Sequence, residues 1–178
     1  MKRNGCYLLV FILFGAAAVS ANVHAEEVNF GDKQPSIDEV VQALKPDAQP
    51  DMKLRGINYH AAPPAPKMVS ITLEFEKNSA QLTPKTEQNL SMIGKALSSN
   101  DLKQLTFTLE GHADASGSAE HNLSLSQKRA DAVKRYLVEN HHIDSATLKV
   151  VGKGESDLLD QNNPESPQNR RVRIVTNQ

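Results

Sequence analysis

The chain has 178 residues and a formal net charge of −1, and only 4% of its residues are aromatic. This charge balance argues against nucleic acid as a partner, because nucleic-acid-binding proteins carry a basic excess. The sequence has no tryptophan, so a wide aromatic platform for stacking sugars is not expected. The length suits one domain of ordinary size with an additional segment.

The first 25 residues have the order of a secretory signal peptide. Lys2 and Arg3 precede an apolar run over residues 6–19, and Val23-His24-Ala25 has the small-x-small pattern of a signal peptidase site. A retained membrane anchor is the alternative, but about fourteen apolar residues are few beside the roughly twenty that span a bilayer. We therefore expect cleavage after residue 25 and export to the periplasm. The single cysteine, Cys6, would leave with the signal peptide, so no disulfide is expected.

Residues 26–67 are expected to form an extension outside the main domain. Ser36 and Glu39 have the spacing of a capping box at the start of a short amphipathic helix over residues 36–45. Its apolar residues recur at helical spacing: Ile37, Val40, Val41 and Leu44. About two turns of helix are too short to be stable alone, so this helix should dock on another surface. The proline-rich residues 61–66 (AAPPAP) then predict an extended linker, which marks the expected domain boundary.

From residue 68 onward, the apolar residues alternate between strand and helix periodicity. Strands are predicted at residues 69–75, 105–110, 148–151 and 172–175, and helices at residues 84–98 and 119–140. In the longer helix, the expected core stripe is Leu123, Ser126, Ala130, Val133 and Leu137. Each helix is apolar on one face only. The order βαβαββ therefore predicts a two-layer α+β domain over residues 68–178, with both helices packed on one face of a small mixed sheet.

Four short motifs in this part of the chain resemble those of the OmpA-like C-terminal domain family. They are residues 75–80 (FEKNSA), residues 111–117 (GHADASG), residues 122–126 (NLSLS) with Arg129-Ala130, and residues 169–172 (NRRV). Each motif is weak alone, but their order along the chain is that of the family. The family includes the peptidoglycan-associated lipoproteins and the stator anchor domains of flagellar motors. The resemblance covers residues 68–177.

The resemblance implies non-catalytic binding of the peptide stems of peptidoglycan, typically through meso-diaminopimelate. The free tip of diaminopimelate is a zwitterion, so its site needs an anion and a cation close together. By resemblance, Asp114 binds the ammonium, and Arg129 binds the carboxylate with its planar guanidinium fork. Asn122 is expected either to bond the stem or to fix the loop. The backbone of Ser79 and Ala80 is expected to line the pocket.

Three of these positions leave alternatives open. Asp114 and Arg129 are also compatible with a structural salt bridge that pins a loop to a helix. The family's common Gly-His-Thr-Asp has Ala113 in third place here, so a hydroxyl is missing that would serve either a loop hydrogen bond or a ligand contact. His112 is interpreted as a hydrogen-bonded structural residue, because a metal site needs three or four ligands.

The sequence has no nucleophile motif, phosphate loop or zinc-protease motif, so neither enzyme activity nor a cofactor or metal is expected. The expected partners are peptidoglycan and an outer-membrane or envelope-complex protein that the domain positions on the wall. The expected location is the periplasm, peripheral to the outer membrane. The alternative function is an adaptor for a secretion, motility or outer-membrane assembly complex, docked through residues 26–60. The sequence leaves the oligomeric state open.

Overall fold

The structure is a computed structural model that describes residues 26–47, 66–73, 75 and 78–177. Its helices are α1 (Ile37–Leu44), α2 (Pro84–Leu97) and α3 (Ala119–His141), with two 3-10 turns, η1 (Ser145–Thr147) and η2 (Pro167–Asn169). Its strands are β1 (Glu26–Asn29), β2 (Lys67–Thr72), β3 (Thr106–His112), β4 (Leu148–Gly154) and β5 (Arg171–Asn177). The expected signal peptide and residues 61–65 of the proline-rich segment lie outside the described residues. Within the described ranges, no helix combines the length and the hydropathy needed to cross a membrane.

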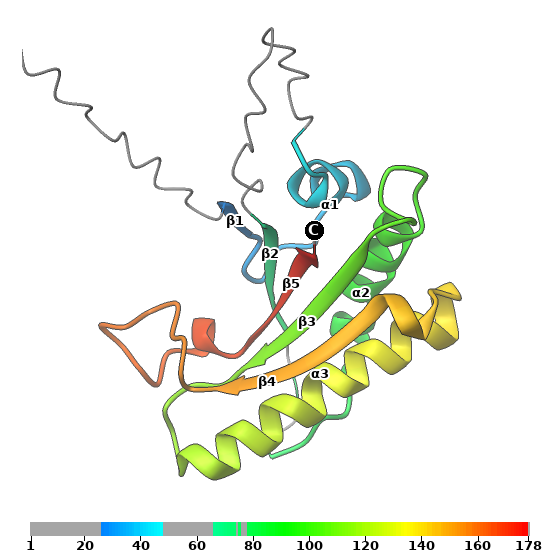
Figure 1. Cartoon of the computed structure of the whole chain (residues 1–178). Helices are drawn as coiled ribbons and strands as arrows, with labels where there is room; N and C mark the ends of the chain where they lie inside the picture. Colours follow the sequence, from blue (N-terminus) through cyan, green and yellow to red (C-terminus); the bar gives the residue numbers. More distant parts are fainter. Residues whose placement is uncertain (1–25, 48–65, 74, 76–77, 178) are drawn as a thin grey trace, which may run out of the picture.

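The five strands form one mixed sheet in the order β1-β2-β5-β3-β4. β5 runs antiparallel between β2 and β3, while β1 pairs in parallel with β2 and β4 pairs in parallel with β3. Figure 1 shows α3 running along β4 and β3, and α3 contacts both strands. From β2 onward the element order is βαβαββ, so the predicted two-layer α+β fold is confirmed.

One face of the sheet carries the apolar side chains that the helices bury. Val69 and Leu109 both pair with Ile174 across β5, so these three residues share a face, and all three are fully buried. The helices add fully buried residues to the same cluster: Leu90 and Ile93 from α2, and Val133 and Leu137 from α3. Burying such a side chain contributes about 1.5–3 kcal/mol, so this layer is the main source of stability.

The segment before the proline-rich residues belongs to this sheet and core, which differs from the separate extension expected from the sequence. β1 pairs with β2, and α1 packs against α2 and β2 after starting at the expected Ser36–Glu39 capping box. Val40 and Leu44 are fully buried, and the hydroxyl of Thr176 in β5 donates to the Leu44 carbonyl at 2.9 Å. The short helix therefore docks on its own domain, because its apolar face completes the core.

The face of α3 that meets the sheet is rotated at the N-terminal end relative to the expected stripe. The four later residues of that stripe are buried, but Leu123 is 51% exposed and Asn122 is buried in its place. A Cβ atom at Gly111 of β3 would lie only 2.1 Å from the carbonyl oxygen of Ser126. The helix backbone thus lies directly on β3 near this point, which leaves no space for a leucine side chain between them.

Side chains of α3 also bond the backbone of β4, the strand at one edge of the sheet. The Gly152 N–H donates to the Gln127 side-chain oxygen at 2.6 Å, and the Gly154 N–H donates to the Ser126 hydroxyl at 2.9 Å. Backbone groups at a sheet edge otherwise invite pairing with another strand, so these bonds protect the edge. They also hold α3 in register with β4, which continues to Gly154, beyond its expected end at Val151.

Candidate functional site

An open pocket of about 340 Å³ lies where β3 ends and α3 begins. Four parts of the chain supply its walls: the segment between β2 and α2, the loop after β3, the first half of α3, and the residue before β5. The lining residues include Phe75, Asn78, Ala113, Asp114, Asn122, Arg129 and Arg170. The fold therefore brings together residues that are far apart in the sequence.

Asp114 is a fixed anion at the end of β3. It is only 8% exposed, and its Oδ2 accepts a hydrogen bond from Nη1 of Arg170 at 2.7 Å. Its Oδ1 accepts from the hydroxyl and the backbone N–H of Ser116. Burial alone would raise the pKa of the Asp114 carboxyl, but the bonds from Ser116 and Arg170 hold this pKa below its ordinary value. The ionised carboxylate is thus the stable form in the pocket.

Arg129 lies in the same pocket as a largely buried cation. Its Nε donates to the Ser79 carbonyl at 3.1 Å, and its guanidinium carbon lies 4.8 Å from the centre of the Phe75 ring. Among the described residues, no carboxylate forms an ion pair with Arg129. Burial and the positive charge of Arg170 lower the pKa of Arg129, whereas the charge of Asp114 raises it. The Asp114–Arg129 salt bridge considered as the structural alternative is therefore absent, because Asp114 pairs with Arg170 instead.

Asn122 fixes the loop that carries Asp114. Its Nδ2 donates to the Asp114 carbonyl at 3.1 Å and to Oε2 of Glu155 at 2.7 Å. Of the two roles left open by the sequence, this geometry shows the loop-fixing one. Ala113 donates its backbone N–H to the Gly154 carbonyl at 2.8 Å, and the residue lines the pocket at the place of the family's threonine.

Ser79 and Ala80 were expected to line the pocket with their backbone, but only Ser79 bonds a residue that lines it. Ser79 contributes its carbonyl oxygen, which orients Arg129. Neither Ser79 nor Ala80 is among the residues that line the pocket. Ser79 therefore acts on the pocket through Arg129, whose bond reaches only the first of these two peptide units.

Arg170 and Phe75 belong to the pocket, but the sequence reasoning did not place them there. The side chain of Arg170 is 43% exposed and pairs with Asp114, whereas that of Arg171 is 2% exposed. Successive side chains at the beginning of a strand point to opposite faces of the sheet. The Arg-Arg pair therefore indicates one buried and one exposed arginine, but the sequence does not show which of the two is buried. Phe75 was expected to continue the first strand of the domain, but β2 ends at Thr72.

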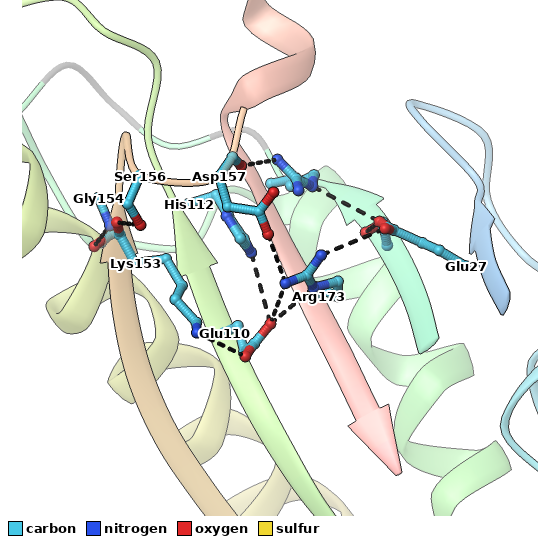
Figure 2. A network of polar contacts seen from close by, with 11 residues as sticks. Glu27, Glu110, His112, Lys153, Gly154, Ser156, Asp157 and Arg173 are labelled. Carbon is cyan, nitrogen blue, oxygen red and sulfur yellow. Dashed lines mark hydrogen bonds and ion pairs between the residues drawn. The ribbon is translucent and has the colours of Figure 1, made fainter. Parts of the chain in front are cut away.

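A second group of charges covers the sheet face opposite the helices, and we call it the open-face cluster. Figure 2 shows Arg173 at its centre, facing carboxylates from different elements. Arg173 lies 2.7 Å from Glu110 Oε2 and from Asp157 Oδ2, and 3.4 Å from Glu27 Oε2. Lys153 lies 3.3 Å from Glu110 Oε1. Each carboxylate has a cationic partner among the described residues, so the cluster ties β1, β3, β4 and β5 together.

His112 is buried beside the open-face cluster, but not as the hydrogen-bonded residue that we expected. Neither ring nitrogen has a hydrogen-bond partner among the described residues, and Nε2 lies 3.9 Å from Glu110 Oε2. Burial, together with the charges of Arg171 and Arg173, lowers the pKa of His112 to about 3. The imidazole is therefore neutral near pH 7 and fills space beneath the two arginines.

The fold and the pocket together define a two-layer α+β domain with an open, charged pocket at one end of its sheet. The model of the OmpA family matches residues 74–172, which is more than half of the chain. The chain therefore belongs to the OmpA family. It is 36% identical over 105 residues to a peptidoglycan-associated lipoprotein of Pseudomonas putida, and the match covers 58% of this chain and 61% of that protein.

Solved structures agree with this placement. The peptidoglycan-associated lipoprotein of Burkholderia pseudomallei is 28% identical with a TM-score of 0.50, over 61% of this chain and 89% of that one. The periplasmic domain of Helicobacter pylori MotB is 16% identical with a TM-score of 0.54, over 62% of this chain and 81% of that one, and shows the shared fold alone. The chain spans about three fifths of the length of the curated lipoproteins that it matches.

Proposed function

We propose that this protein binds the peptide stems of peptidoglycan through diaminopimelate and so holds an envelope component on the cell wall. The observation that carries the proposal is the pair of opposite charges in one open pocket. Asp114 and Arg129 both line it, and they do not pair with each other. The similarity to peptidoglycan-associated lipoproteins supports the class of ligand.

Asp114 and Arg129 match the two charges of the zwitterionic tip of diaminopimelate in sign. The Asp114 carboxylate receives the ammonium, and the guanidinium of Arg129 donates to the carboxylate through its terminal nitrogens. Charge-assisted hydrogen bonds contribute about 1.5–3 kcal/mol each, so affinity for one stem is modest. Firm attachment to the wall then depends on many molecules or on several contacts per molecule.

We further propose that binding is the whole activity and that it takes place in the periplasm. In the pocket the Ser116 hydroxyl donates to Asp114, but the pKa of that carboxyl is held below its ordinary value, so the carboxylate is a poor general base. The leader expected at residues 1–25 would direct export. Cell fractionation with N-terminal sequencing of the purified protein tests both the location and the cleavage after residue 25.

The binding site is tested by pull-down of the purified protein with isolated sacculi. Asp114→Asn and Arg129→Gln each remove one charge with little change of shape. We expect each variant to lose at least about tenfold in binding, because each removes the partner of one end of the zwitterion.

Matched controls come from the exposed side of α3, where Asp131→Asn and Arg135→Gln remove the same charges away from the pocket. These controls should bind like the wild type. Full binding by both pocket variants would overturn the site assignment. Absence of binding between the wild-type protein and sacculi would overturn the proposed function.

The adaptor alternative, with docking through residues 26–60, receives no support from α1. Val40, Val41 and Leu44 of this helix are buried against the rest of the domain. An amphipathic helix binds a partner's groove with its apolar face, and here that face is already covered.

A further inference from the structure

The guanidinium of Arg170 is only partly used by its bond to Asp114. Nη1 donates to Asp114 Oδ2 at 2.7 Å, and this is the single hydrogen bond of the side chain to the described residues. A guanidinium has five N–H donors, and the side chain of Arg170 is 43% exposed at the rim of the pocket. Several donors therefore remain available to a ligand on the Asp114 side of the pocket.

The described lining of the pocket also has more cations than a zwitterion requires. Arg129 and Arg170 face one carboxylate, Asp114, and the charge of Arg170 lowers the pKa of Arg129. The two guanidinium groups are thus close enough to repel one another. Glu74 and Glu76 lie outside the described residues, so this balance refers to the described lining alone.

A bound zwitterion has no net charge, so it would leave the excess positive charge of the lining in place. Its ammonium would also add a positive charge next to Arg170. Its ammonium would share the Asp114 carboxylate with Arg170, so two cations would lie against one anion. Two cations bound to the same carboxylate repel each other, and the repulsion is stronger in a partly buried site than in water. A second carboxylate on the ligand, placed against Arg170, would remove the conflict.

We propose that Arg170 is a second carboxylate-binding residue of this pocket, and that the ligand is a stem segment with a free carboxylate outside the diaminopimelate tip in addition to the carboxylate in the tip. The inference rests on the proposed function and names the charge pattern of its ligand. Arg170 then has two roles: it orients Asp114 for the ammonium, and it binds the carboxylate that lies outside the diaminopimelate tip.

The test uses calorimetric titration of the purified protein with three synthetic peptides. The parent is N-acetyl-L-Ala-γ-D-Glu-meso-diaminopimelate, and the other two carry an amide at one of the two carboxylates outside the tip. We expect one of the amides to bind the wild type about tenfold more weakly, because it loses a charge-assisted contact. The Arg170→Gln variant should bind the same amide as tightly as the parent peptide, because this variant lacks the contact that the amide removes.

This coupling separates a ligand contact from a merely structural role of Arg170, which would weaken all three peptides equally. Arg170→Lys keeps the charge and should retain part of the preference, and Arg135→Gln should behave like the wild type. If both amides bind the wild type as well as the parent does, or if the amide and Arg170→Gln effects add, the inference is wrong while the proposed function stands. If the parent peptide does not bind at all, the proposed function itself is wrong, and this inference falls with it.

Discussion

Asp114 and His112 are close neighbours at the end of β3, but their side chains meet opposite environments. Asp114 faces the pocket, where Ser116 and Arg170 stabilise its charge. His112 faces the other side of the sheet, where burial and two arginines disfavour a charge. β3 ends at His112, so the side chain of Asp114 follows the course of the loop after the strand, which turns it towards the pocket.

The buried His112 makes the stability of the protein depend on pH. Its pKa is about 3 in the folded protein and near 6.5 when exposed, so only the unfolded chain takes up this proton between those values. Stability should therefore fall as the pH drops from 6.5 towards 3, by up to about 1.4 kcal/mol per pH unit from this residue. Urea unfolding between pH 4 and 7 measures this slope, and His112→Gln should reduce it by that amount.

His121→Gln is the matched control, because His121 lies exposed in the first turn of α3. It should keep the wild-type slope. Equal pH dependence in the wild type and in His112→Gln would show that the imidazole is not held neutral by its surroundings.

The contact between α3 and β3 sets the distance between Asp114 and Arg129, the two charged residues that we propose bind the ligand. Asp114 follows β3 directly, and Arg129 lies within α3, so the approach of these two elements decides how far apart the side chains are. Gly111 permits that approach, because any larger residue would meet the backbone of Ser126. The glycine that opens the GHAD motif thus positions the site without touching a ligand.

Replacing Gly111 by alanine should destabilise the fold and weaken sacculus binding together. The added Cβ would lie 2.1 Å from the carbonyl oxygen of Ser126, and backbone at that point moves only with the helix. Overpacking of this kind costs about 1–3 kcal/mol in the free energy of unfolding, which urea denaturation measures. Thr106→Ala, at the exposed start of β3, should leave both properties nearly unchanged. Wild-type stability in Gly111→Ala would mean that α3 does not lie this close to β3.

Across the molecule, the N-terminal segment and the C-terminal strand stabilise one another. α1 buries its apolar face on α2 and β2, and the carbonyl of its last residue, Leu44, accepts a hydrogen bond from the Thr176 hydroxyl. Glu27 of β1 pairs with Arg173 of β5. The core therefore combines residues from both ends of the described chain. β1 forms one edge of the sheet, and β2 and β5 lie between it and β3. β1 is therefore separated by two strands from β3, at whose end the pocket lies.

Leu44→Ala tests whether the N-terminal segment is part of the domain. The side chain is fully buried, so its truncation should lower the free energy of unfolding of the whole protein by about 2–5 kcal/mol in a single transition. Gln42→Ala, on the exposed side of α1, is the control and should change stability by less than about 0.5 kcal/mol. An unchanged unfolding curve for Leu44→Ala would instead support a separate extension.

The sequence by itself determined the local structure and the family of this protein. The capping box at Ser36 and the strand alternation over residues 105–110 are short-range patterns, and the structure has both of them where they were expected. The motifs around Asp114 and Arg129 identified part of the pocket lining, Asp114, Asn122 and Arg129, because they recur in a known order. Local propensity and motif order need no knowledge of distant contacts.

Only the tertiary structure decided which distant residues meet. The sequence did not tell that α1 completes the core, that Asn122 replaces Leu123 on the buried face of α3, or that Arg170 rather than Arg129 pairs with Asp114. Each outcome depends on how closely two elements approach and on which side of a strand a residue begins. Such distances are set by the packing of the whole core, so they are absent from any short stretch of sequence.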